Sequence, residues 1–291
     1  MTNRTVFYAI KPKLVIEGAG VLLRRSIAPL ATNEYDPFLL FDHFAFNDPL
    51  EGPVRGFPMH PHRGIDTVTY MLEGSVNHRD SLGNEDRITP GDVQWMTSGR
   101  GILHEEMPRR SEASGNIYGF QLWVNLPAAQ KMGPPSYRSV KSSTIPVVEK
   151  DGASVRIVAG KLDGIRGPVT EIAASPLYMD VKLAPASKFI YPIPKGHTVL
   201  AYVFEGEGNF AGNPSTSSGQ GLVESVQMVF FNDDGDNIEV STDAAGSGVQ
   251  FMLIAGAPFK EPIVPYGPFV MNTVAEIKQT ILELQNGTFI K

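Results

Sequence analysis

Two histidines separated by one residue are the first group in the sequence that could do chemistry. They are His60 and His62, within the segment FPMHPHRG. Side chains of an extended segment alternate between its two faces, so both imidazoles point to the same side. Pro61 restricts its own φ and favours an extended conformation at His60. The pair could therefore chelate a metal ion, although an isolated His-x-His is more often two polar surface residues near a turn.

A second pair of the same kind lies further along the chain, in the segment GRGILHEEMP. By the same alternation of side chains, His104 and Glu106 share one face of a strand, and Glu105 points to the other face. Two chelating pairs on neighbouring strands give four nitrogen and oxygen donors that converge from one side. Such a set suits Fe(II), Mn(II), Ni(II), Cu(II) or Zn(II), and it leaves room for water or substrate. We therefore predict one metal ion with four protein ligands: His60, His62, His104 and Glu106.

The bulk composition narrows the classes of protein to which the chain can belong. It has no cysteine in 291 residues, which excludes disulfides, thiolate nucleophiles, zinc–thiolate sites and iron–sulfur clusters. The net charge is −6 and no basic stripe is visible, which disfavours direct nucleic-acid binding. No run approaches the ~20 apolar residues of a membrane helix, and the N-terminus lacks the apolar core of a secretion signal. We expect a cytoplasmic protein, or a nuclear one in a eukaryote, that binds no membrane.

The elements that must position these ligands are short β-strands. Runs at 67–72, 155–158 and 199–204 are rich in β-branched and aromatic residues, and each is bounded by Gly, Pro, Asn or Asp. The 29 glycines and 23 prolines are spread through the chain rather than gathered in one linker. Regular short strands with such turns are typical of a sandwich or barrel.

One helix is expected, near the C-terminal end of the chain. Thr273 and Glu276 form a capping box, and Gly287 is placed for a C-cap. We expect the helix to be structural, with an apolar stripe that packs on a barrel. The stripe consists of Val274, Ile277, Ile281 and Leu284.

An internal repeat divides the chain into two copies of one β-domain. The segment TVTYMLEG at 67–74 is similar to VLAYVFEG at 199–206, with Tyr, Glu and Gly matching at one offset. Nearly the same offset brings Val93-Gln94 onto Val226-Gln227. We expect a metal-binding domain at 1–138 and a second domain at 139–291. The Gly-, Ser- and Asn-rich stretch between Phe210 and Leu222 is expected to be a flexible surface loop.

Both metal motifs resemble those of the pirin family within the cupin superfamily. The resemblance covers FPMHPHRGIDTVTYMLEG and PGDVQWMTSGRGILHEEMP, and it extends to DPFLLFDHF at 36–44 and GPFVMNT at 267–273. It implies an all-β bicupin, two jelly-roll β-barrels face to face with a C-terminal helix. It also implies that the first barrel holds the metal through the residues that match the motifs. These are the same four that strand periodicity selects: His60, His62, His104 and Glu106.

The sequence departs from the general cupin pattern in two ways. Cupins usually place a glutamate after the His-x-His pair, and Thr67 stands there, whereas the pirin pattern takes its carboxylate from the second motif. In the second copy, counting back from the repeat puts Pro192 and Pro194 opposite the two histidines, and Asn237 near the place of His104. Proline has no side-chain ligand, so we expect the second barrel to be metal-free.

The resemblance implies two alternative functions that would use the same site. Members of the family include enzymes that open the flavonol quercetin by 2,3-dioxygenation, and this is the leading expectation, with Fe(II) as the metal and Ni(II), Cu(II), Co(II), Mn(II) or Zn(II) as alternatives. Glu106 would then be both ligand and candidate base for the flavonol hydroxyl, with O₂ as the second substrate. The alternative is a non-enzymatic, iron-dependent regulator that binds a transcription factor or a metabolic enzyme.

The remaining histidines are given structural interpretations. His43 is expected to be satisfied within a barrel wall, while His78 and His197 are expected to be exposed near turns. Trp95, Trp123, Phe57 and Met59 could wall an apolar pocket at the metal, but aromatic residues in small barrels usually belong to the core.

Overall fold

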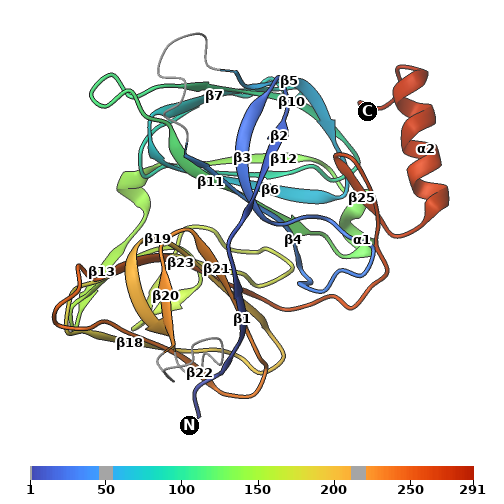
Figure 1. Ribbon diagram of the computed structural model, residues 1–291. Coiled ribbons are helices and arrows are strands. Elements are labelled where there is room, and N and C mark those ends of the chain that lie inside the picture. The colour runs from blue at the N-terminus through green and yellow to red at the C-terminus, as the bar shows by residue number, and fades with distance from the viewer. Residues whose placement is uncertain (1, 46–54, 211–220) are drawn as a thin grey trace. The chain divides into compact units, whose positions relative to one another are not determined.

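The computed structural model describes residues 2–45, 55–210 and 221–291. Strands dominate, and the described chain holds two α-helices, α1 (Ala128–Lys131) and α2 (Val274–Gln285) (Figure 1). The expected all-β class, with two barrel domains and a C-terminal helix, is confirmed. The expected loop between Phe210 and Leu222 lies outside the described residues. No helix among the described residues is long and apolar enough to cross a membrane.

The chain divides into two compact units whose boundaries differ from those expected. The first, called here the N-barrel unit, comprises 13–142 and 259–291, and the second, the C-barrel unit, comprises 1–12 and 143–258. The junction after Ser142 lies close to the expected boundary at 138. The two ends of the chain, however, belong to the units opposite to those that their place in the sequence indicates. Counting along the sequence cannot detect this exchange, because it arises from strand pairing over more than 200 residues.

The N-barrel unit is built from two antiparallel sheets. The larger has the order β12-β9-β6-β11-β4-β3-β2 and the smaller the order β5-β10-β7-β8. The bounds of the larger sheet are β2 (Lys13–Glu17), β3 (Val21–Ile27), β4 (Phe38–Ala45), β6 (Ile65–Glu73), β9 (Val93–Thr97), β11 (Tyr118–Asn125) and β12 (Ser136–Val140). Those of the smaller are β5 (Phe57–His62), β7 (Ser75–Asp80), β8 (Glu85–Ile88) and β10 (Ile102–Arg109). A short hairpin, β24 (Val264–Tyr266) and β25 (Phe269–Met271), precedes α2.

The C-barrel unit repeats this arrangement, with one strand taken from the start of the chain. Its main path is β1-β21-β19-β23-β17-β14-β13, which matches the larger sheet of the N-barrel strand for strand. β1 (Val6–Ile10) therefore takes the place that β12 has in the N-barrel. The other strands of the path are β13 (Val147–Lys150), β14 (Ala153–Ala159), β17 (Leu177–Leu183), β19 (Thr198–Phe210), β21 (Gln227–Phe231) and β23 (Val249–Gly256). The unit is completed by β15 (Lys161–Leu162), β16 (Ile165–Arg166), β18 (Lys188–Pro192), β20 (Leu222–Glu224) and β22 (Asn237–Ser241), and the 3₁₀ turn at Ser142–Thr144 lies at the junction.

The interior of the C-barrel is filled by apolar side chains where the N-barrel has imidazoles. On β18 the buried residues are Phe189 and Tyr191, and Pro192 is exposed. The alignment of the two copies that the repeat predicted is therefore one residue out of phase at this strand, because the prolines point outward and Tyr191 points inward. Tyr191 is paired with the buried Ile238 of β22, much as His60 is paired with His104. Large apolar side chains at these positions leave a packed core.

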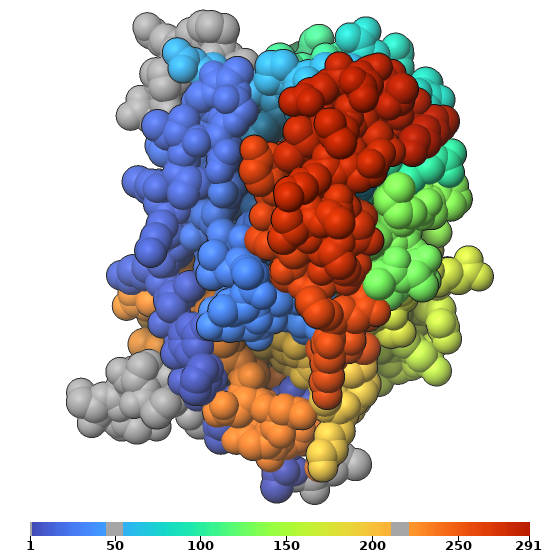
Figure 2. Space-filling model, turned by 90° about the vertical axis from the view of Figure 1, so that its right-hand side faces the viewer, coloured from blue at the N-terminus to red at the C-terminus, as the bar shows by residue number. Residues whose placement is uncertain are grey.

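Helix α2 begins with the expected capping box. The Thr273 side chain accepts a hydrogen bond from the Glu276 backbone N–H, and the Glu276 carboxylate accepts one from the Thr273 backbone. Gly287 follows the helix with φ +68°. Within the C-terminal segment, red in Figure 2, Ile277 packs with Phe269 and Phe289, and Arg63 of the N-barrel donates to Glu283 of α2. Val274, expected in the apolar stripe, is 58% exposed instead.

Candidate metal centre

Strands β5 and β10 run antiparallel and bring the two predicted pairs together. His104 is the cross-strand partner of His60. The ring centroids are 4.3 Å apart for His60 and His104, 4.9 Å for His60 and His62, and 5.0 Å for His62 and His104. One ring nitrogen from each lies within 4.8 Å of those of the other two. The three imidazoles thus form a single group on the inner face of the smaller sheet.

Backbone carbonyl groups determine which ring nitrogen of each histidine on β5 carries hydrogen. Nδ1 of His60 is 2.9 Å from the Pro58 oxygen, and Nδ1 of His62 is 3.2 Å from the Pro268 oxygen. A carbonyl oxygen can only accept, so each Nδ1 donates, and the Nε2 atom is left to bind a cation. These two Nε2 atoms lie 3.1 Å apart. Two lone pairs at that separation repel each other unless they share a positive species, either a proton or a metal ion.

The surroundings of His104 indicate that the shared positive species is a metal ion rather than a proton. The His104 side chain is fully buried, and neither of its ring nitrogens has a hydrogen-bond partner among the described residues. Burial, together with the neighbouring imidazoles of His60 and His78, lowers the pKa of His104 well below its ordinary value. Burial and the same kind of neighbours also lower the pKa of His62. A neutral buried imidazole with two orphaned nitrogens is costly in a protein but is suited to ligation. The three residues therefore fit a divalent metal ion.

Glu106, the fourth predicted ligand, is buried near the imidazoles but already has three polar partners. Its Oε1 accepts hydrogen bonds from the Thr69 hydroxyl at 2.9 Å and the Gln94 amide at 3.1 Å, and its Oε2 accepts one from the Gln121 amide at 2.9 Å. It does not belong to the group of ligand atoms within 4.8 Å of one another. The β10–β5 register shifts between His104 and Glu106, and such irregularities re-aim side chains.

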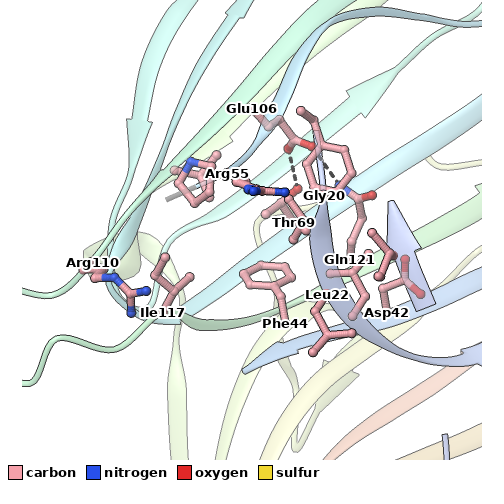
Figure 3. Close-up of a pocket in the computed structure, with 16 residues that line it drawn as sticks. Gly20, Leu22, Asp42, Phe44, Arg55, Thr69, Glu106, Arg110, Ile117 and Gln121 are labelled. Atoms are coloured by element: carbon pink, nitrogen blue, oxygen red, sulfur yellow. Dashed lines mark hydrogen bonds between the residues drawn. The ribbon is translucent and has the colours of Figure 1, made fainter. Parts of the chain in front are cut away.

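Two neighbouring cavities of the N-barrel lie beside these residues, one at the imidazoles and one at Glu106. The imidazole cavity, about 570 Å³, is lined by His60 and His62 together with Trp123. The carboxylate cavity, about 380 Å³, is lined by Glu106 and mainly by apolar side chains, including Leu22, Phe44 and Ile117. Figure 3 shows these walls and the hydrogen bonds from Thr69 and Gln121 to Glu106. The two cavities share three lining residues: Asp42, Phe57 and Gln121.

Aromatic rings hold the imidazoles from the side of the imidazole cavity. Trp123 packs edge-on against His62 with 5.2 Å between ring centroids, and Phe57 lies 6.1 Å from His60. These two residues therefore do line the pocket at the imidazoles. Trp95 belongs to the core, where its indole N–H donates to Asp66 at 2.9 Å.

The expectation that His78 is exposed is wrong. Its side chain is fully buried, its Nε2 lies 3.2 Å from Asp80, and its ring stacks on Tyr137. Its ring centroid is 5.5 Å from that of His104. The turn near Asn77 suggested exposure, but β7 is an inner strand between β10 and β8, and a local sequence signal cannot show this.

The other two histidines, His43 and His197, differ in their exposure. His43 is buried in the barrel wall against Tyr118 and Phe120, as expected, and burial with the nearby charge of Arg24 lowers its pKa to about 3. His197 is partly rather than fully exposed.

Several residues of the site were not identified from the sequence. Thr69, Gln94 and Gln121 bind Glu106 from three different strands, and Pro268 contacts His62 across 206 residues of sequence. Strand periodicity could have indicated Thr69, which follows Thr67 on the same face. Nothing local to Pro268 indicates a contact with an imidazole.

Comparisons with known proteins agree with this fold. Two family models match the chain, Pirin over residues 21–124 and the Pirin C-terminal cupin domain over residues 178–290. The chain is 42% identical to human Pirin over 287 residues, which cover 98% of this chain and 94% of the relative. It is 40% identical to Pirin-like protein 2 of Arabidopsis thaliana over 286 residues, which cover 98% of this chain and 85% of the relative.

A solved structure of a quercetin 2,3-dioxygenase from Acinetobacter baumannii superposes with a TM-score of 0.85 at 31% identity, and the match covers 99% of both chains. Family models over both barrels and full-length relatives at about 40% identity leave one assignment. The chain belongs to the pirin family.

Proposed function

We propose that this protein is a metal-dependent oxygenase that cleaves a flavonol-type substrate with O₂, in the manner of a quercetin 2,3-dioxygenase. The observation that carries the proposal is the group of three imidazoles, two of them with Nε2 freed by carbonyl partners, beside two substrate-sized cavities. The name of the similar Acinetobacter baumannii enzyme supports the reaction class.

His60, His62 and His104 would hold the metal ion, and Glu106 would complete the ligand set. Bound there, a redox-active divalent ion, for which Fe(II) is our first choice, would supply Lewis acidity and one-electron chemistry toward O₂. The side chains present are nitrogen and oxygen donors, which suits such an ion.

The carboxylate cavity would receive the substrate. Its volume, about 380 Å³, lies within the roughly 300–1,000 Å³ typical of small-molecule sites. Leu22, Phe44 and Ile117 offer an apolar surface to a flat aromatic body and exclude water from it.

Glu106 would accept the proton of the substrate hydroxyl. A carboxylate oxygen has two acceptor sites, and Oε2 uses one of them for the Gln121 amide. The other remains, and it would serve the metal ion or, when Glu106 acts as the base, the substrate hydroxyl at the wall of the cavity. Thr69 and Gln94 on Oε1 hold the carboxylate in a fixed orientation, which a positioned base requires.

Oxygen uptake tests the proposal. The protein is loaded in turn with Fe(II), Ni(II), Cu(II) and Co(II), and O₂ consumption is followed with quercetin in an oxygen electrode. We expect uptake that matches the loss of quercetin for at least one metal, and its disappearance in His104→Ala. His197→Ala, in the C-barrel, is the matched control and should keep the wild-type rate.

No uptake with any of the four metals would refute the oxygenase. The same metal site would then be better explained by the regulatory role.

A further inference from the structure

A buried lysine lies close to the imidazole group and takes no part in the function proposed above. Lys131 ends helix α1 and is 1% exposed. Its ammonium donates to the Gly64 oxygen at 2.7 Å, the Asn125 side-chain oxygen at 2.6 Å and the Val270 oxygen at 2.7 Å. An ammonium group has three protons, so all of its donors are used.

Two of these acceptors belong to the segments that place His62. Gly64 follows His62 by two residues, at the turn from β5 to β6. Val270 follows Pro268 by two residues, and the Pro268 oxygen is the partner of His62 Nδ1. The ammonium therefore joins the turn that follows the strand of the imidazole to the hairpin that carries its carbonyl partner.

The two segments lie so close that they leave no room for a side chain between them. The Val270 N–H donates to the Arg63 oxygen at 3.2 Å, and Arg63 pairs with Phe269 in a parallel bridge. Gly64 has φ +81°, and a Cβ built there would lie 2.3 Å from the Val270 oxygen. Without the ammonium, the Gly64 and Val270 oxygens would both lose a buried donor, and the Val270–Arg63 hydrogen bond would be left to hold the two segments together.

A positive charge here is not explained by ion pairing with its immediate partners. The three acceptors are neutral carbonyl oxygens, two from the backbone and one from an amide. Burial lowers the pKa of Lys131 to about 7, which shows how unfavourable the site is for the charged form. A buried charge of this kind is weak evidence for stability, and in some proteins such groups hold one arrangement of the surrounding chain.

We propose that Lys131 is a positioning residue for the metal ligand His62. It holds the Pro268 carbonyl against His62 Nδ1, and this keeps the imidazole in the orientation and tautomer that direct Nε2 at the metal. The inference rests on the metal-binding part of the proposed function but not on the reaction.

The first measurement is made on metal-free protein. In Lys131→Met, which keeps the length of the side chain and removes its donors, the ¹⁵N chemical shifts of the His62 ring report the tautomer. We expect wild type to show a protonated Nδ1 and an unprotonated Nε2, and the variant to show exchange between tautomers. His62→Gln identifies the signals, which is practical because the chain has only six histidines.

The second measurement is the Ni(II) dissociation constant, obtained by competition with a chelator. Loss of a group that orients a metal ligand typically weakens metal binding about 10–100-fold, and we expect a change of that size in Lys131→Met. The Co(II) absorption spectrum should shift as well, because the ligand geometry changes.

Arg4→Met provides the matched control. Arg4 is also a 1% exposed cation that binds three backbone carbonyls, those of His197, Pro194 and Gly235, but it lies in the C-barrel unit. This variant loses the same number of hydrogen bonds to the chain together with an ion pair to Asp233, so it should lower stability and leave the Ni(II) dissociation constant unchanged. Asn125→Ala removes one acceptor only, and we expect an intermediate loss of Ni(II) affinity even if Lys131→Met does not fold.

The outcomes distinguish a failure of this inference from a failure of the proposed oxygenase function. If Lys131→Met and Asn125→Ala keep the His62 shifts and the Ni(II) affinity of wild type, Lys131 is merely structural and the inference is wrong. If they change both while quercetin consumes no O₂, the inference stands and the oxygenase fails. If wild type binds no Ni(II), the His62 shifts of the metal-free variants still decide whether Lys131 positions this ring.

Discussion

At the scale of single residues, two adjacent glutamates of β10 have opposite surroundings. Glu106 is buried and accepts three hydrogen bonds inside the barrel, whereas Glu105 lies on the outer side and pairs with Arg79 at 3.0 Å. Strand alternation alone predicts this difference, and the structure confirms it. Only the inner carboxylate can reach a substrate in the cavity.

We expect Glu106→Gln to lower kcat for quercetin by about 100-fold or more, because a positioned base typically contributes a factor of 10²–10⁴. KM should change much less, since the apolar walls of the cavity remain. Steady-state kinetics at a verified metal content measure both constants. Glu105→Gln is the matched control on the same strand, and a variant at Glu106 that behaves like this control would remove Glu106 from the mechanism.

At the scale of elements, a buried ion pair attaches helix α2 to the strand of the first two histidines. Arg63, directly after His62, is 1% exposed and donates to Glu283 at 2.5 Å and to Thr280 at 2.9 Å. Its guanidinium also lies 4.5 Å from the Phe289 ring centroid. The inner face of the helix therefore carries Thr280 and Glu283 beside Ile277, a polar stripe that apolar periodicity does not detect.

We expect Glu283→Gln to lower the free energy of unfolding of the N-barrel by about 3 kcal/mol, because it leaves a buried guanidinium without its charged partner. Urea unfolding followed by tryptophan fluorescence measures this. Lys278→Gln, on the exposed side of the same helix, should change stability by less than about 0.5 kcal/mol. Equal effects of the two substitutions would show that the ion pair adds nothing to the attachment of α2.

At the scale of the whole molecule, titratable groups are distributed unevenly between the two units. Five of the six histidines and both tryptophans lie in the N-barrel unit. The C-barrel interior is a large apolar cluster. One unit thus carries buried imidazoles in its barrel, and the other carries a large apolar core.

Acid should therefore destabilise the metal-free N-barrel before the C-barrel. Burial lowers the pKa of His43 to about 3 and those of His62 and His104 well below the ordinary value, so on unfolding these rings take up protons below pH ~6.5. Their contribution to stability is complete above pH ~6.5 and is lost as the pH falls, by about 1.4 kcal/mol per pH unit for each proton taken up. Asp36, Asp42 and Asp66 act in the opposite sense, because burial raises their pKa values, that of Asp66 to about 6, so they offset the imidazoles only as the pH falls below about 6.

Tryptophan fluorescence reports only the N-barrel, and far-UV circular dichroism reports the whole chain. Between pH 7 and 5, we expect the urea midpoint by fluorescence to fall more than the midpoint of the remaining dichroism change. His197→Gln, in the C-barrel, should leave the fluorescence midpoint unchanged. Midpoints that coincide at every pH would contradict the assignment of the acid sensitivity to the N-barrel.

By itself, the sequence determined the features that depend on a few neighbouring residues. Period-two alternation selected His60, His62 and His104 and separated Glu106 from Glu105, and the capping box marked the start of the helix. The absence of cysteine limited the ligands to nitrogen and oxygen. These signals are local because side-chain direction in a strand or helix follows directly from backbone geometry.

Only the tertiary structure decided which distant segments complete the site. The carbonyl partner of His62, the acceptors of Lys131 in distant segments, and the buried place of His78 depend on contacts between segments far apart in the sequence. So does the exchange of chain ends, in which β1 fills an edge of the C-barrel and residues 259–291 pack on the N-barrel. Such pairings are selected by which buried donors and acceptors satisfy each other after folding, and no short stretch of sequence contains both partners.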